Sequence, residues 1–162
     1  MDKKLQKLFN DQIKNEIYSA YLYLAMAAYA ESKNLPGFSS WLKIQYKEEL
    51  SHAMKMFEFL ADRGVAINLE AIEQPKTEYK SPADVFENVL AHEKKVTALI
   101  NALYETAIKV SDHAASVFLQ WFISEQVEEE KNATTIVENL KIIKPDSSAL
   151  IMFDRQLGKR QG

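Results

Sequence analysis

The sequence predicts an all-α fold: a four-helix bundle with one long crossover connection, followed by a short fifth helix. Over long stretches, apolar residues recur every three or four positions, the period of a helix with one buried face. Prolines and glycines, which break or cap helices, fall between or beyond these stretches. They are Pro36, Pro75, Pro82, Pro145, Gly37, Gly64, Gly158 and Gly162.

The first two helices form an antiparallel pair. The first, about residues 2–31, repeats apolar side chains at Leu5, Phe9, Ile13, Ala20, Leu24 and Ala27. The sequence Asn34-Leu35-Pro36-Gly37 is expected to turn the chain. The second helix, about residues 38–63, is expected to stop at Gly64.

The third and fourth helices form a second antiparallel pair. Ser81-Pro82 combines an N-cap with a proline in the first turn, so the third helix is expected over residues 82–110. A short corner at Ser111-Asp112 leads to the fourth helix, residues 113–141. A fifth helix is expected over residues 147–157, and all five belong to one domain, residues 1–162.

The connection between the two pairs decides the topology. Residues 65–80 have no sustained period and contain Pro75. At about 3.3 Å per extended residue, this segment can run the whole length of the second helix, roughly 39 Å. The second and third helices can therefore run parallel, which gives up-down-down-up order.

Composition excludes several classes of function. The net charge of −3 makes no case for binding nucleic acid or a membrane surface. The absence of cysteine excludes disulfides, thiolate zinc sites and iron–sulfur clusters. The longest uncharged run, residues 17–30, is shorter than a membrane span, and no secretory signal is seen after Met1. A cytoplasmic protein is expected.

A Glu-x-x-His motif, Glu49 and His52, lies on the apolar stripe of the second helix. The other three long helices also carry a carboxylate on the core-facing stripe near their middles: Glu16, Glu93 and Glu129. Four buried carboxylates would repel one another and lose their hydration. Two divalent cations would neutralise them, and oxygen ligands with one imidazole suit iron or manganese.

Other residues are expected to be structural. Glu128 and Glu130 are expected on a solvated face, and His92 and His113 lie off the stripe and are expected at the surface. Tyrosines in the first helix favour packing or subunit contact over electron transfer.

The chain resembles the non-haem bacterial ferritins, within the ferritin-like di-iron carboxylate family, over nearly its whole length. The segments that carry the resemblance are residues 15–23, 48–53 and 121–130. They read Asn-Glu-Ile-Tyr-Ser-Ala-Tyr-Leu-Tyr, Glu-Glu-Leu-Ser-His-Ala and Trp-Phe-Ile-Ser-Glu-Gln-Val-Glu-Glu-Glu. Bacterioferritins carry a haem-ligating Met where this chain has Leu50, so no haem is expected.

The resemblance implies a set of roles. One iron would be held by Glu16, Glu49 and His52, and the second by Glu49, Glu93 and Glu129 with Gln126 beside it. A third iron site would use Glu48, Glu125 and Glu128 with Glu129. Tyr23 would be a redox-active tyrosine near the two irons.

By the same resemblance, the chain would be a ferroxidase that oxidises Fe²⁺ with O₂ or H₂O₂ and stores a ferric mineral. Twenty-four subunits would form a hollow cage, with the apolar fifth helix packed around the four-fold axes. Two other classes stay open from the residues alone. A di-metal enzyme acting on an organic substrate would elute as a monomer or dimer, and a metal-free structural bundle would not bind Fe²⁺.

Overall fold

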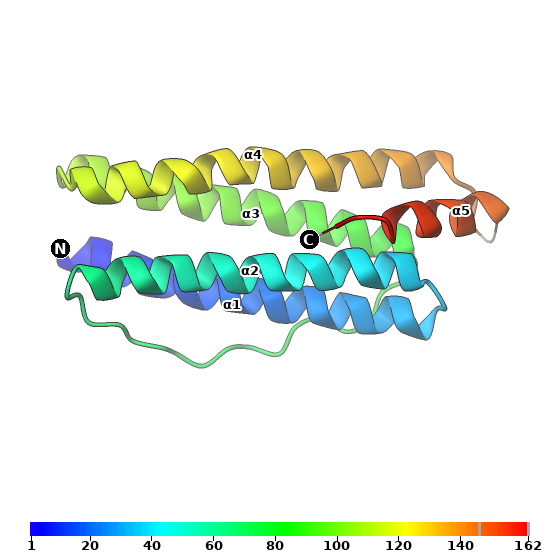
Figure 1. The fold of residues 1–162 in the computed structure, drawn as a ribbon, viewed down its shortest axis with the longest axis horizontal. Coiled ribbons are helices and arrows are strands. Elements are labelled where there is room, and N and C mark those ends of the chain that lie inside the picture. The colour runs from blue at the N-terminus through cyan, green and yellow to red at the C-terminus, as the bar shows by residue number, and fades with distance from the viewer. Residues whose placement is uncertain (146, 162) are drawn as a thin grey trace.

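A computed structural model describes residues 1–145 and 147–161 (Figure 1); the predicted domain end, Gly162, lies outside them. This part of the chain contains helices and no strand. The helices are α1 (Lys3–Ser32), α2 (Pro36–Asp62), α3 (Pro82–Lys109), α4 (His113–Ile142) and α5 (Ser148–Leu157). The predicted fold class, a four-helix bundle with a short fifth helix, is confirmed.

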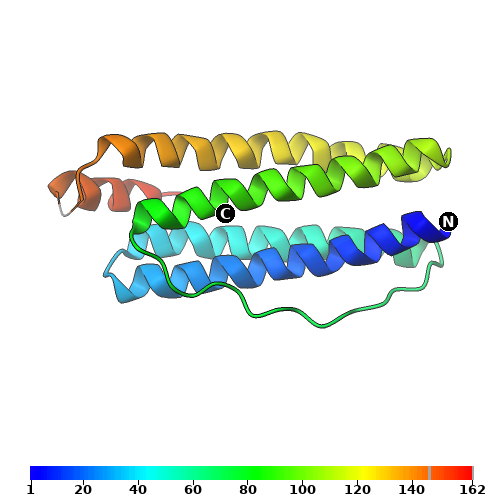
Figure 2. The same ribbon diagram turned by 180° about the vertical axis from the view of Figure 1, so that it is seen from behind.

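The long crossover gives the predicted up-down-down-up order. In Figures 1 and 2 it runs along the outside of the α1–α2 pair, so that α2 and α3 are parallel. Polar contacts attach it to α1. The Gln6 side chain donates to the Ala66 carbonyl at 3.0 Å, and the Asn68 backbone N–H donates to Asn10 Oδ1 at 2.6 Å. Lys14 pairs with Glu70 at 2.8 Å.

Side-chain caps explain where three helices begin. Asp2 accepts hydrogen bonds from the first backbone N–H groups of α1, Ser81 from α3 and Asp112 from α4. Asp112 also forms an ion pair with the Arg63 guanidinium at 2.9 Å and accepts a hydrogen bond from it at 3.0 Å, which joins the end of α2 to the start of α4.

The turn between α1 and α2 is shorter than the sequence suggests. Asn34, with φ of 55°, reverses the chain, and Pro36 is already the first residue of α2. Proline suits this position because its fixed φ matches the helix and its missing N–H has no partner there. Gly37 is therefore helical and buried. A Cβ at Gly37 would lie 1.7 Å from the Asp154 carbonyl oxygen, so only glycine permits this approach of α5.

Helix α5 packs on the end of the bundle beside the start of α2 (Figure 1). Asp154 is buried, and its Oδ1 accepts a hydrogen bond from the Phe38 backbone N–H at 2.9 Å. The Phe38 and Phe153 rings meet edge to face, with centroids 5.9 Å apart. Ile151 and Met152 point away from this contact and are exposed.

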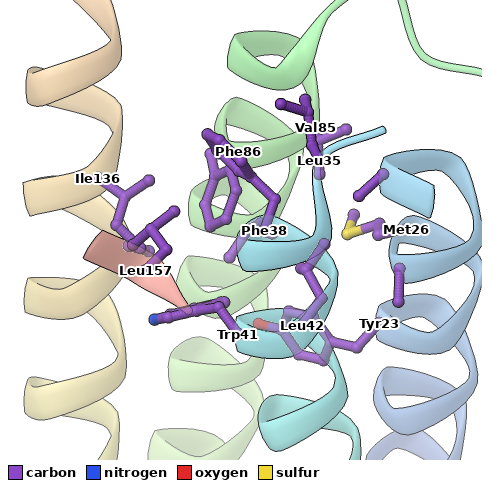
Figure 3. Packing of buried hydrophobic residues seen from close by; sticks show 14 of the residues in the cluster. Tyr23, Met26, Leu35, Phe38, Trp41, Leu42, Val85, Phe86, Ile136 and Leu157 are labelled. Atoms are coloured by element: carbon purple, nitrogen blue, oxygen red, sulfur yellow. The ribbon is translucent and has the colours of Figure 1, made fainter. Parts of the chain in front are cut away.

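The interior consists of two hydrophobic clusters. One lies toward α5 and includes Phe38, Trp41 and Phe86, whose packing is seen in Figure 3. The other lies toward the N-terminus and includes Phe9 and Met56. The sequence prediction for α1 needs one change. Leu24 is 39% exposed, whereas neighbouring Tyr23 is fully buried. With 3.6 residues per turn, adjacent side chains point in different directions, and Tyr23 is the one on the buried face.

In the part of the chain that the structure describes, no helix combines the length and apolar character needed to cross a membrane.

Candidate metal centre

A layer of buried polar side chains separates the two hydrophobic clusters. On α1, Glu16 follows Ile13 of one cluster and precedes Tyr23 of the other. The same change occurs at the middle of the other long helices. The buried members are Glu16, Glu49, His52, Glu93, Gln126 and Glu129, with Gln12 and Gln45 beside them. The four glutamate residues are between 1% and 4% exposed, so bulk water does not solvate their carboxylates.

The first group of metal-ligating atoms comes from α1 and α2. Ligand atoms of Glu16, Glu49 and His52 all lie within 4.8 Å of one another. His52 Nδ1 is 3.7 Å from Glu49 Oε2, as expected for residues three apart on one helix face. A single cation between these atoms would contact all three side chains.

The second group joins α2 to α4. Ligand atoms of His52, Glu125 and Glu129 lie within 4.8 Å of one another, and His52 Nε2 is 3.9 Å from Glu125 Oε1. His52 thus lies between the two groups. This position differs from the set of ligands that the resemblance implies, in which Glu125 belongs to a third site.

Glu93 of α3 is held by two donors. The Tyr23 hydroxyl of α1 donates to Glu93 Oε1, and Gln126 Nε2 of α4 donates to Glu93 Oε2 at 3.1 Å. These two hydrogen bonds, one to each oxygen, fix the orientation of the Glu93 carboxylate. Glu93 is not within either group of close ligand atoms among the described residues.

Two glutamines orient the other carboxylates. Gln12 donates to Glu16 Oε1 at 2.8 Å, and Gln45 donates to Glu129 Oε2 at 2.8 Å. Neither glutamine was assigned a role from the sequence. For Gln12 the signal was present, since it lies one turn before Glu16 on the same helix face. Gln45 bonds to a glutamate of another helix, and no spacing within α2 indicates that partner.

Burial raises the pKa of all four central carboxyls. For Glu16 and Glu49 the pKa lies well above the ordinary value, chiefly because burial removes water and secondly because other carboxylates are near. Burial also raises the pKa of Glu93, against the hydrogen bonds from Tyr23 and Gln126. The pKa of Glu129 is raised to about 7, by burial and then by Glu93. The raised pKa values mean that the negative form of each carboxyl is disfavoured in the bundle. A bound cation would favour that form by supplying a nearby positive charge.

One atom indicates directly that a ligand belongs here. Among the described residues, Glu16 Oε2 is the buried side-chain oxygen without a hydrogen-bond partner. An unpartnered buried carboxylate oxygen is costly. Because Glu16 also belongs to the first group of metal-ligating residues, a metal ion fits the donor set. Carboxylates with one imidazole suit iron.

The remaining predicted residues lie around this centre. Glu48 is partly buried and pairs with Arg160 at 2.7 Å, Glu125 joins the second group, and Glu128 is exposed. The structure therefore does not bring Glu48 and Glu128 into a cluster of close ligand atoms with Glu125, within the residues it describes.

His92 differs from its prediction. His113 is exposed as expected, but His92 is partly buried, and its Nε2 lies 2.7 Å from Ser19 Oγ. The Tyr18 and Tyr23 rings flank the imidazole. Burial, and secondly Lys95, lowers the pKa of His92 to about 4, so the ring is neutral at pH 7. The surface prediction for His92 is wrong, because α1 covers this edge of α3.

Known proteins match this chain over almost its whole length. Residues 6–143 match the model of the ferritin-like domain. The chain is 38% identical over 160 residues to a bacterial non-heme ferritin of Staphylococcus haemolyticus, covering 99% of this chain and 96% of the relative. It is 37% identical over 158 residues to a probable bacterial non-heme ferritin-like protein of Haemophilus influenzae, covering 98% and 96%.

Solved structures agree with these relatives. A crystal structure described as an open pore ferritin from the hyperthermophilic archaeon Archaeoglobus fulgidus superposes with a TM-score of 0.98. It is 48% identical, and the match covers 99% of both chains. A humanized archaeal ferritin gives the same TM-score and identity, over 100% of this chain and 99% of the other.

Proposed function

The chain belongs to the ferritin-like domain family, and from this premise we propose that it stores iron and oxidises Fe²⁺ at the buried polar layer. Iron is the substrate, and it leaves the centre as Fe³⁺ for a mineral inside a protein cage. The observation that carries the proposal is Glu16, which has a buried carboxylate oxygen without a partner, Oε2, and a ligand atom within 4.8 Å of ligand atoms of Glu49 and His52.

Two iron positions follow from the arrangement of donors. Glu16, Glu49 and His52 would hold the first Fe²⁺. Glu49, Glu93 and Glu129 would hold the second, with Gln126 beside it, since Glu93 and Glu129 extend the layer from α3 and α4. Two Fe²⁺ ions carry four positive charges, which balance four carboxylates. Glu125, with Glu48 and Glu128, would take a third iron at the edge of the layer.

The two iron positions suit a two-electron reaction. Oxidation of two Fe²⁺ to two Fe³⁺ releases two electrons, which with two protons reduce O₂ to H₂O₂, or H₂O₂ to two water molecules. Tyr23 holds Glu93 in place from α1 and would serve as the redox-active tyrosine. Gln12 and Gln45 orient Glu16 and Glu129 through their amide donors.

The assembly we propose is a 24-subunit cage with α5 around the four-fold axes. Support comes from the ferritin relatives and from the side of α5 that its own bundle leaves uncovered. Ile151 and Met152 are 55% and 70% exposed on that side, which is a large apolar surface for a short helix.

The test is aerobic addition of Fe²⁺ to the purified protein, with the appearance of ferric absorbance followed in time. We expect a fast oxidation phase and a soluble iron core in a large assembly by size-exclusion chromatography. His52→Ala should abolish the fast phase, because it removes the imidazole shared by both groups of ligand atoms. His113→Ala, at an exposed position, is the matched control and should leave the rate unchanged.

Two outcomes would contradict the proposal. A fast phase that survives His52→Ala removes His52 from the centre. A protein that binds no Fe²⁺ under anaerobic conditions is a structural bundle instead.

A further inference from the structure

The chain after α5 runs back toward the middle of the bundle and places one cation beside the polar layer (Figure 1). This cation is Arg160, whose side chain is 21% exposed. Its Nη1 donates to Gln45 Oε1, and its Nη2 donates to Glu48 Oε2 at 2.7 Å. Its guanidinium carbon lies 4.6 Å from the centroid of the Trp41 ring. These three partners recur at helical spacing, so Arg160 covers a single face of α2.

Gln45 lies between Arg160 and the metal centre. It is fully buried, and its Nε2 donates to Glu129 Oε2 at 2.8 Å. Glu129 belongs to the second group of close ligand atoms, together with His52 and Glu125. The contacts therefore form one chain of hydrogen bonds, which begins in the C-terminal segment and ends on a residue of the metal centre.

The chemistry at the two ends of this chain determines the direction of the Gln45 amide. A guanidinium only donates hydrogen bonds, and an ionised carboxylate only accepts them. The amide oxygen must therefore face Arg160, and the amide nitrogen must face Glu129. A cation bound to Glu129 would compete with the amide for the carboxylate charge. Arg160 holds the other end of the amide and keeps its orientation when the centre is loaded.

Arginine suits this position because of its shape. Gln45 and Glu48 lie about one turn apart on α2, and the guanidinium reaches both with two nitrogens in a fixed geometry. The ammonium group of a lysine is a point charge and lacks this fork. The ion pair of Arg160 with Glu48 carries no net charge. The effect of Arg160 on the metal centre is therefore transmitted mainly by the hydrogen bond to Gln45.

We propose that Arg160 is a positioning residue of the metal centre, which acts through Gln45 to hold Glu129 in the orientation that binds a cation. This inference rests on the proposed function. A carboxylate that is already oriented loses less freedom when the cation arrives, so the cation binds more tightly. The coupling is reciprocal, so a cation bound at Glu129 also stabilises the contact of Arg160 with Gln45.

The test is anaerobic titration of the full-length assembly with Zn²⁺, a redox-inert probe, followed by calorimetry. Glu129→Gln identifies the Zn²⁺ ion whose binding depends on Glu129. Arg160→Lys should weaken binding of that same ion by about three- to tenfold. This is at or below the lower end of the effect of removing a direct partner of a ligand, because Arg160 acts through one further residue. Lysine keeps the positive charge, so a loss of affinity reports the position of Gln45 and Glu129.

A matched control and a double variant separate this route from others. Arg155→Lys makes the same change at an exposed position of α5 and should leave Zn²⁺ affinity unchanged. Gln45→Leu breaks the chain and should weaken binding of the ion at Glu129 by about tenfold. Arg160→Lys combined with Gln45→Leu should weaken it no further, because the two changes interrupt one chain.

A second measurement reads the coupling from the other end. Hydrogen exchange of the C-terminal segment, followed by mass spectrometry, reports on the Arg160 N–H, which donates to the Leu157 carbonyl at 3.2 Å. Zn²⁺ should slow this exchange in the unmodified protein and have less effect in Gln45→Leu. A purely structural role of Arg160 would give the same exchange with and without Zn²⁺.

Three results would overturn the proposal: unchanged Zn²⁺ affinity in Arg160→Lys, additive losses in the double variant, or exchange that does not respond to Zn²⁺. They leave the proposed function intact as long as the protein binds and oxidises Fe²⁺. A protein that binds no Fe²⁺ under anaerobic conditions would instead overturn the proposed function.

Discussion

Tyr23 of α1 donates its hydroxyl hydrogen to Glu93 of α3 across the centre of the bundle. Both side chains are fully or almost fully buried. The pair connects the two antiparallel helix pairs at the level of the polar layer. It also fixes one oxygen of a proposed iron ligand, so that the geometry of the metal centre depends on a residue that does not carry a charge at pH 7.

Tyr23→Phe should slow the fast phase of Fe²⁺ oxidation by about tenfold, the smaller end of the effect seen when partners of metal ligands are removed. Loss of the hydroxyl also leaves Glu93 Oε1 without its donor, which should lower metal-free stability by about 1–3 kcal/mol. Stopped-flow absorbance and thermal unfolding measure the two effects. Tyr21→Phe is the control, because Tyr21 is 50% exposed. Equal rates for Tyr23→Phe and Tyr21→Phe would contradict the role of the buried hydroxyl.

The metal-free protein should lose stability as pH rises. Burial raises the pKa of Glu129 from 4.5 to about 7, so the folded state binds this proton more tightly than the unfolded state. Unfolding free energy therefore falls between the unfolded and folded pKa values, by on the order of 3 kcal/mol for Glu129. The raised pKa values of Glu16, Glu49 and Glu93 add in the same direction.

Calorimetric unfolding of metal-free protein from pH 5 to pH 8 measures this decrease, and Glu129→Gln should make it smaller. Added Zn²⁺ should stabilise the protein more at pH 8 than at pH 5, because the ligands must be deprotonated to bind it. Stability that rises over this range without metal would show that the four carboxyls are not a source of mutual repulsion.

Glu49→Gln should separate stability from metal binding. The substitution keeps the size of the side chain but removes a charge that Glu93 and Glu129 oppose. We expect the metal-free protein to melt about 2–4 °C higher, as for a gain of about 1 kcal/mol. Anaerobic Fe²⁺ titration should show loss of the first two ions. A variant that melts lower and still binds both ions would remove Glu49 from the centre.

Gly37→Ala should undock α5. An added Cβ would lie 1.7 Å from the Asp154 carbonyl oxygen, which is backbone and cannot rotate away. The result expected is faster proteolysis of the C-terminal segment, because α5 no longer packs against the start of α2. Limited proteolysis followed by mass spectrometry measures this effect.

Asp154→Asn provides the matched comparison for α5. An asparagine oxygen can still accept from the Phe38 backbone N–H, so this variant should keep α5 docked, whereas Asp154→Ala should release it. If Gly37→Ala is as resistant to protease as the unmodified protein, the close approach of Gly37 and Asp154 does not hold α5.

The order of the helices and the level of the four carboxylates follow from sequence patterns. Helical period decides which residues share a face, so Glu49 and His52 had to lie together, and Glu16, Glu93 and Glu129 had to interrupt apolar stripes. The start of α2 was less predictable, because proline fits both a turn and a first helical position.

The sequence by itself determined the bundle, its long crossover and the mid-helix position of its buried charges, because these depend on spacing within single helices and on connection length. Only the tertiary structure decided which carboxylate oxygen faces which donor, that His92 is covered by α1, and that Arg160 reaches Glu48. Arg160 and Glu48 are 112 residues apart. No local period relates such positions, and the packing of α5 against α2 is what brings them into contact.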